Sequence, residues 1–232
     1  MISQSSWITI EIATSCRTNK ELCGSSALHK FLICWAACAN RDTSKWLNSM
    51  RQIPKPTSSE HVAYVRQYID LLPDDGLVLE HLRANLNATS AFLCSLPEDL
   101  LLFRYAADKW TIKEIVQHLS DDERIYTYRA LRFARGDRTE LPGFDQDAYT
   151  LEARANRRTI DDLLGELATV RAATLSLYAG IEDDLLVLTG VASGNVMSVR
   201  AIAYHIAGHE LRHINIIRER YLSTGNAGTL PN

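Results

Sequence analysis

The stretch IAYHIAGHELRHINII, residues 202–217, decides the fold of this protein. Three of its isoleucines and two of its histidines fall on one side of a helix. These residues are Ile202, Ile206, His209, His213 and Ile216. The spacings between them are four, three, four and three residues, which is the pattern of a buried helix face in a bundle. This line of residues is called the seam below. The stretch therefore predicts a core helix that carries two imidazoles one turn apart.

Helical periodicity continues along the chain from residue 58 onward. Thr111-Ile-Lys-Glu114 is a capping box, in which the two outer side chains satisfy backbone N–H groups at a helix start. Ser198 is a second candidate cap, and no segment alternates clearly enough to predict a strand. The pattern predicts an all-α protein, a four-helix bundle, with a short helix over 58–72 and long helices over 74–95, 111–135, 159–178 and 198–222.

Composition limits the classes of protein that the chain can represent. Its 232 residues can bury one sizeable core, alone or with an appendage. A formal net charge of -3 argues against a nucleic-acid binder, which usually carries a basic surplus. No apolar run approaches the ~18 residues that cross a bilayer, and five cysteines without a CxxC pair indicate neither a disulfide framework nor a cysteine zinc site. We therefore expect a cytoplasmic protein without nucleic-acid or membrane partners.

The first 49 residues differ from the rest of the chain. They hold four of the five cysteines and three of the four tryptophans, and they lack a sustained helical or strand period. At Met50 the sequence begins to look like the start of a protein, with a short polar lead-in to the first helix. We expect residues 1–49 to be an N-terminal extension, either poorly ordered or a mis-called translation start. Residues 50–232 are expected to form the bundle domain.

His209-Glu-Leu-Arg-His213 matches the HExxH pattern of zinc peptidases, but its surroundings do not. One peptidase class needs a helix-breaking glycine where this chain has Ile216, and Glu210 lies about 100° around the helix from His209. The peptidase interpretation is therefore rejected. Two buried imidazoles are costly unless their nitrogens are satisfied, which favours a shared metal over plain core packing. His205, at the edge of the seam, is expected to be a hydrogen-bonded flanking histidine.

A third metal ligand would come from another helix. The histidines outside the last helix are His29, His61, His81 and His118. His118 lies at the border of the apolar arc of its helix, so periodicity leaves a ligand and a half-buried histidine both open. On the same helix, Asp121 is expected to face outward and Asp122 to lie beside His118.

Several separated motifs follow one another along the chain, namely KWTIKEIVQHLSDDER at 109–124, YRALRFARGD at 128–137, LPGFDQDAY at 141–149, HELRH at 209–213 and RERY at 218–221. In this order they resemble the DinB-like (YfiT-like) family of metal-dependent proteins. The resemblance covers approximately residues 50–222 and leaves residues 1–49 unmatched.

The resemblance implies a four-helix bundle of the DinB/YfiT-like type that holds a divalent metal on three histidines. Carried onto this sequence, the ligands are His118, His209 and His213. Three imidazoles leave coordination positions open, as in catalytic sites. Zinc or nickel would suit nitrogen ligands, and iron or manganese are further candidates. The family also implies a homodimer, and no catalytic or cofactor-binding residue beyond the three ligands is predicted.

The expected function is that of a metalloenzyme that activates a low-molecular-weight thiol for transfer to an electrophile. The resemblance implies this because relatives in the wider superfamily use such thiols for conjugation or isomerisation. A metal-dependent hydrolase that uses a metal-bound water and a non-catalytic, metal-stabilised stress-response bundle stay open as alternatives. The substrate is expected to be a small molecule. The second long helix carries four arginines, namely Arg124, Arg129, Arg132 and Arg135. They could bind the carboxylates of a thiol cofactor, but we favour the interpretation that they lie on a solvent-exposed helix face.

Overall fold

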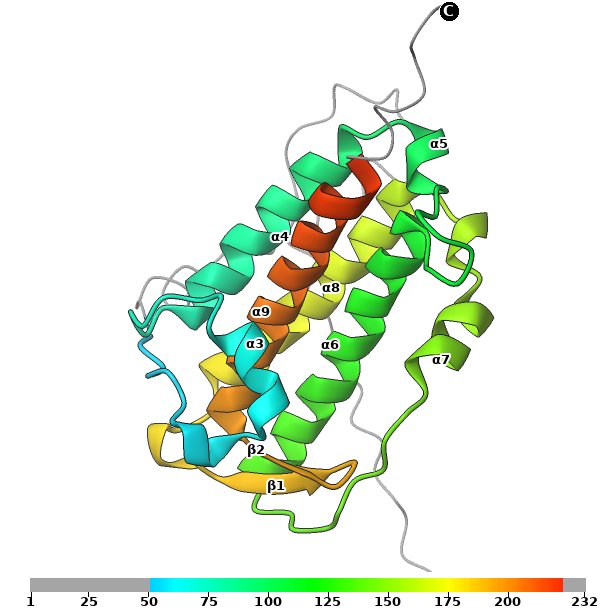
Figure 1. Ribbon diagram of the computed structural model, residues 1–232. Helices are drawn as coiled ribbons and strands as arrows, with labels where there is room; N and C mark the ends of the chain where they lie inside the picture. Colours follow the sequence, from blue (N-terminus) through cyan, green and yellow to red (C-terminus); the bar gives the residue numbers. More distant parts are fainter. Residues whose placement is uncertain (1–50, 223–232) are drawn as a thin grey trace, which may run out of the picture. The chain divides into compact units, whose positions relative to one another are not determined.

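The computed structural model describes residues 51–222, all within one unit of the chain, Ser49–Asn232 (Figure 1). The predicted N-terminal extension, residues 1–49, lies outside the described residues, and the domain division at Met50 stays a prediction. None of the helices between residues 51 and 222 is long and apolar enough to cross a membrane.

Four long helices form a bundle, as the sequence predicts (Figure 1). Each packs against two of the others, in the ring order α4, α9, α6, α8 and back to α4. The ring gives every helix a buried side, because an amphipathic helix must cover its apolar stripe with a neighbour. The helices are α4 (Val78–Cys94), α6 (Ile112–Ala134), α8 (Ile160–Ala179) and α9 (Val199–Ile216), which continues as a π-helical turn over Ile217–Tyr221.

Local side chains fix where these helices begin. Thr111 Oγ1 accepts from the Glu114 N–H at 3.1 Å, and the Glu114 carboxylate accepts from the Thr111 N–H at 2.8 Å, which confirms the capping box. Ser198 caps α9 by accepting from a backbone N–H at 3.0 Å. Helix α4 begins later than predicted, because residues 74–77 form a turn in which Gly76 has a φ of 72°.

The short helix predicted over 58–72 is wrong in extent. The segment contains two 3-10 turns and a short α-helix, namely Ser58–Glu60, Ala63–Val65 and α3 (Arg66–Ile69). Between the turns, His61 is extended, with φ −155° and ψ 158°, and it forms an antiparallel bridge with Met197. A partner far away in the sequence therefore overrides the local helical pattern.

A two-stranded hairpin precedes α9, so the prediction that the chain has no strand is wrong. Strands β1 (Thr189–Ala192) and β2 (Asn195–Ser198) pair antiparallel around a turn of Ser193 and Gly194. The turn residues have φ of 52° and 72°, and positive φ at both is typical of a type I′ hairpin turn. Strands of four residues are too short for their alternation to be recognised.

Two short helices lie outside the ring. Helix α5 (Glu98–Leu101) follows α4, and α7 (Gln146–Ala153) precedes α8 and packs along α6 (Figure 1). Asp145 caps α7 by accepting from two backbone N–H groups at 3.0 and 3.1 Å. Just upstream, Leu141 bridges to Ala192, which anchors the connection between α6 and α7 to β1. Single 3-10 turns cover Ala155–Arg157 and Asp183–Leu185.

Helix α3 crosses α9 at a glycine. A Cβ at Gly208 would lie 2.1 Å from the Tyr68 carbonyl oxygen, so a larger residue would push the two helices apart. The close crossing brings the Tyr68 ring edge-on to His205 and His209, with ring centroids 5.0 and 5.4 Å apart. Tyr68 therefore covers His205 and His209.

Candidate metal centre

Three histidines from two helices meet in the core of the bundle. His118 comes from α6, and His209 and His213 lie one turn apart on α9. The Nε2 atom of His209 lies 3.3 Å from Nε2 of His118 and 3.0 Å from Nε2 of His213. His118 is only 3% exposed, although periodicity placed it at the border of its apolar arc. The structure thus brings together the three residues predicted as ligands.

The donor geometry suits one shared cation. Nitrogen atoms bound at about 2.0–2.1 Å to one zinc ion lie roughly 2.8–3.4 Å apart for octahedral to tetrahedral angles. The two measured distances, 3.0 and 3.3 Å, fall in this range. The ligand atoms of all three residues lie within 4.8 Å of one another. Metal binding itself stays a prediction.

Burial keeps these imidazoles neutral. It lowers the pKa of His118 and brings the pKa of His209 down to about 3. Burial and repulsion from His209 hold the pKa of His213 well below its ordinary value. A histidine must be neutral to coordinate a metal, so near pH 7 all three side chains are in the form that binds one.

Asp122 approaches His209 from the side of the ring opposite to Nε2. Its Oδ2 atom lies 3.3 Å from Nδ1 of His209. At this distance the carboxylate favours a proton on Nδ1 and so leaves the Nε2 lone pair free for a metal. The sequence placed Asp122 beside His118, and only the packing of α6 on α9 directs it to a histidine of the other helix.

His205 is a second buried histidine of α9 that faces Asp122. It is 2% exposed, and its Nε2 atom lies 3.5 Å from Oδ2 of Asp122. Within residues 51–222 neither ring nitrogen of His205 forms a hydrogen bond of good geometry, and the Asp122 carboxylate partners this flanking histidine at ion-pair distance. Asp122, His205 and His209 also have ligand atoms within 4.8 Å of one another. His209 therefore belongs to two groups of ligand-type side chains.

Aromatic rings cover this histidine cluster, which comprises His118, Asp122, His205, His209 and His213. The Trp110 ring centroid lies 4.7 Å from that of His118 and 6.4 Å from that of His213, against which it stacks. Tyr126 stacks on His205 with centroids 4.0 Å apart. These rings reduce contact with water, and electrostatic interactions are stronger in such surroundings.

Two cavities reach the histidine cluster. The outer cavity, of about 680 Å³, borders His213, and the inner cavity, of about 190 Å³, borders Asp122, His205 and His209. Gln146, the first residue of α7, lines both of them. The connection that contains it therefore contributes to the pocket walls as well as joining two helices.

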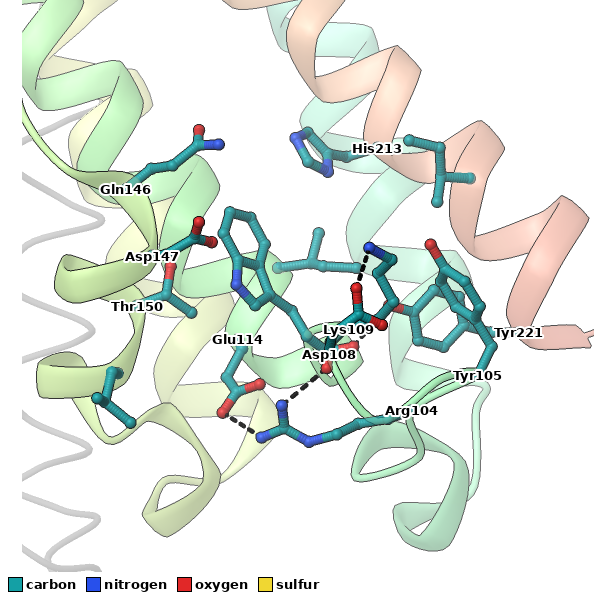
Figure 2. Close-up of a pocket in the computed structure, with 14 residues that line it drawn as sticks. Arg104, Tyr105, Asp108, Lys109, Glu114, Gln146, Asp147, Thr150, His213 and Tyr221 are labelled. Atoms are coloured by element: carbon teal, nitrogen blue, oxygen red, sulfur yellow. Dashed lines mark hydrogen bonds and ion pairs between the residues drawn. The ribbon is translucent and has the colours of Figure 1, made fainter.

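The outer cavity has a polar wall and an aromatic wall. Figure 2 shows Gln146, Asp147 and Thr150 on one side, Tyr105 and Tyr221 on the other, and His213 between them. The basic side chains at this cavity are paired with carboxylates: Arg104 with Glu114 at 2.8 Å and Lys109 with Asp108 at 2.7 Å. The cavity is thus wide, polar on one side and in contact with a predicted metal ligand.

A second polar cluster joins all four bundle helices. Arg171 of α8 lies 2.8 Å from a carboxylate oxygen of Glu123 on α6 and 2.8 Å from one of Glu210 on α9. Thr89 of α4 donates to Glu210 at 2.6 Å, and Arg171 also donates to the Leu82 carbonyl. Thr89, Glu123, Arg171 and Glu210 are called the arginine cluster below. Because Glu210 is held there, it does not face the histidines as the glutamate of a HExxH peptidase must.

Comparison with known proteins identifies the family. The family model of the DinB superfamily matches residues 81–217, which is more than half of the chain. This chain belongs to the DinB superfamily. No curated protein matches it.

A solved structure similar to this DinB protein is YfiT from Bacillus subtilis, with a TM-score of 0.56 and 18% sequence identity. The alignment covers 74% of this chain and 93% of that one. YfiT is described as "a probable metal-dependent hydrolase with an unusual four-helix bundle topology". At this identity the likeness supports the fold of the DinB protein and confirms the predicted four-helix bundle.

The four arginines on α6 and at its C-terminal end have different surroundings. Arg124 and Arg132 pair with carboxylates, and Arg135 is exposed, as expected for a solvated face. Arg129 differs, because it is buried against the inner cavity. Helical periodicity alone did not predict this burial, which depends on the connection and the hairpin that pack over α6.

Proposed function

We propose that this DinB protein is a metalloenzyme in which His118, His209 and His213 hold one divalent cation. The observation that carries the proposal is the convergence of three neutral imidazole nitrogens beside a cavity of about 680 Å³. Three ligands leave coordination positions open, whereas structural sites are closed by four. When bound, the cation would lower the pKa of a thiol or a water molecule at an open position.

A low-molecular-weight thiol is the preferred nucleophile. The volume of the outer cavity falls within the ~300–1,000 Å³ of typical small-ligand pockets, so a thiol with a sizeable polar carrier fits beside His213. The thiol would lose its proton, its sulfur would form a bond to an electrophilic carbon, and the leaving group would depart with its electron pair. Zinc or nickel best suits the nitrogen ligands, and iron or manganese come next.

Other residues of the chain would support this chemistry. Asp122 keeps the proton of His209 on Nδ1, away from the ligand atom. Trp110 covers the rings of His118 and His213 and so limits the access of water. Both residues would act by binding and orientation. The reacting molecules would enter through the cavities.

Metal content tests the proposal directly. Elemental mass spectrometry on protein purified without a histidine tag should find near-stoichiometric divalent metal in the wild type. We expect the metal to be lost in His118→Ala and kept in His81→Ala, a control whose histidine lies on α4 outside the cluster. Folded wild type without metal would overturn the proposal.

Ligand exchange then separates a catalytic site from a structural one. In the cobalt-substituted protein, adding cysteine or azide should change the visible spectrum if a coordination position is open. An unchanged spectrum would favour the non-catalytic, metal-stabilised bundle.

A metal-dependent hydrolase is the second candidate, and the description of the structural neighbour YfiT favours it. In that case water rather than a thiol would be the nucleophile. Assays of cysteine conjugation to 1-chloro-2,4-dinitrobenzene and of p-nitrophenyl acetate hydrolysis would distinguish the two. Only the activity that disappears in His118→Ala counts as that of this site.

A further inference from the structure

Arg129 of α6 is a buried arginine for which the described part of the chain provides no carboxylate. Its side chain is 6% exposed and lines the inner cavity. One Nη atom donates to the Pro142 carbonyl at 3.3 Å, and Cζ lies 4.7 Å from the Tyr126 ring centroid. Within residues 51–222, no Asp or Glu oxygen lies within 4.0 Å of its guanidinium nitrogens. The charge is therefore buried without a counter-ion from the described residues.

Arg171 shows the arrangement that this protein uses when a buried guanidinium is satisfied internally. It is 1% exposed, and two carboxylates and a backbone carbonyl accept its hydrogen bonds. A guanidinium has five N–H donors and stays charged, and an uncompensated buried charge is strongly unfavourable. Arg129 uses one donor on an uncharged carbonyl. Its other donors are free to bind an anion that enters the cavity.

The inner cavity around Arg129 is small, and aromatic and polar side chains line it together. Its aromatic lining comes from Tyr64, Tyr68, Tyr126, Phe133 and Phe144, and Ser193 and Asn195 of the hairpin add polar groups. Among the described residues that line it, Arg129 is the only Arg or Lys and Asp122 the only Asp or Glu. Asp122 lies seven residues earlier on α6, about 10.5 Å along the helix axis. The cavity thus has a positive end at Arg129 and a negative end at the histidine cluster.

We propose that the inner cavity binds a small aromatic carboxylate, with its carboxylate on the Arg129 guanidinium and its ring among the tyrosines. A carboxylate matches the planar donor fork of arginine, and the two form paired hydrogen bonds. An aromatic ring packs well against the edges and faces of other rings. A volume of about 190 Å³ restricts the ligand to a small molecule.

The position of the cavity gives this ligand a role only if the proposed function also holds. His209 borders the inner cavity at the end opposite to Arg129 and is a predicted metal ligand. A molecule anchored at Arg129 would then be the anionic substrate, while the thiol would enter through the outer cavity. The carboxylate site itself rests on Arg129 and the cavity, and it does not require a metal.

Calorimetric titration of the full-length protein tests the site with benzoate and with benzamide, a neutral molecule of nearly the same shape. Benzoate should bind the wild type and benzamide should bind at least tenfold more weakly. Arg129→Gln should lower benzoate affinity at least tenfold, equivalent to about 1.4 kcal/mol. The control Arg135→Gln removes an exposed arginine of the same helix end and should leave the affinity unchanged. Equal affinity of Arg129→Gln and wild type would overturn the proposal.

A carboxylate could also bind a metal, so the titration is repeated on His118→Ala. Benzoate binding that survives in this variant and disappears in Arg129→Gln supports the carboxylate site, whatever the fate of the metal proposal. Binding that disappears in His118→Ala and survives in Arg129→Gln would place the carboxylate on the metal. That result would overturn the site at Arg129 and support the metal centre.

Nuclear magnetic resonance keeps the test valid if Arg129→Gln does not fold. The side-chain Nε–H signal of Arg129 in the isotopically labelled wild type should shift on addition of benzoate and stay in place with benzamide. A signal whose chemical shift changes with neither molecule would overturn the proposal.

Discussion

The histidine cluster and the arginine cluster are built from neighbouring residues of the same two helices, yet they differ in how far they are satisfied. Helix α6 contributes Asp122 to the first and Glu123 to the second, and α9 contributes His209 and Glu210 in the same way. In the arginine cluster every charge has an internal partner. In the histidine cluster, Oδ2 of Asp122 approaches His209 and His205 only at ion-pair distances of 3.3 and 3.5 Å, and neither this oxygen nor the ring nitrogens of His205 form a hydrogen bond of good geometry within the described residues.

This difference separates a structural role from a functional one. A buried ionic network with complete hydrogen bonding fixes how helices pack. Because its polar groups are already paired, a ligand would not stabilise it further. Buried polar atoms without partners are costly, and a protein keeps them where a metal or substrate compensates. The arginine cluster therefore aligns the four helices, and in the proposed function the histidine cluster uses that alignment to hold a metal.

Breaking the arginine cluster should have the largest effect on stability. Arg171→Met leaves Glu123 and Glu210 buried without their cation, so the free energy of unfolding should fall by about 3–5 kcal/mol. Urea denaturation measures the change. Arg124→Met, which breaks half-exposed ion pairs with Asp121 and Glu166, should cost no more than ~1 kcal/mol. Similar losses in the two variants would refute the structural role.

The histidine cluster should make the metal-free protein sensitive to mild acid. The pKa values of His118, His209 and His213 are lowered by folding, so these residues stay neutral while the unfolded chain takes up protons below about pH 6.5. The unfolded state then binds more protons, and stability falls as the pH falls. Between pH 7.5 and 6.0 the loss should be ~0.8 kcal/mol for each of His209 and His213, whose pKa values lie well below this range, and His118 should add to it.

Denaturation of metal-free protein across this pH range measures that loss. His209→Ala removes one of the three histidines and should give a shallower dependence than the wild type. An equally steep dependence in the variant would show that other groups cause it.

Replacing the carboxylate that faces His209 should weaken metal binding without abolishing it. Asp122→Asn is expected to lower metal affinity 10–100-fold, because outer-shell carboxylates orient and polarise the ligand histidine. Competition with a chromogenic chelator measures the affinity. The neighbouring Asp121→Asn is the matched control, since Asp121 pairs with Gln117 and Arg124 instead. Equal affinities for both variants would exclude an orienting role for Asp122.

The smallest effect should come from the edge of the arginine cluster. Thr89→Val removes one hydrogen bond to the Glu210 carboxylate and keeps the side-chain shape, so it should cost about 1.5 kcal/mol. Metal content should not change. Thr169→Val, on the exposed side of α8, should stay within ~0.5 kcal/mol of the wild type. A loss of metal in Thr89→Val would mean that the two clusters are coupled.

The sequence by itself determined the helices of the bundle and the two histidines of its last helix. Capping and amphipathic periodicity are local, since a cap involves residues three apart and a seam repeats every three or four. For this reason the starts of α6 and α9 and the shared face of His209 and His213 were predictable. The family motifs, rather than periodicity, selected His118 as the third ligand.

Only the tertiary structure decided which distant side chains meet. Packing of α6 on α9 directs Asp122 to His209 and Glu123 to the arginine cluster, although the two acids are adjacent in the sequence. A bridge to Met197 breaks the helix predicted around His61, and the segments that pack over α6 bury Arg129. These outcomes depend on contacts between residues far apart in the chain, which a local pattern cannot encode.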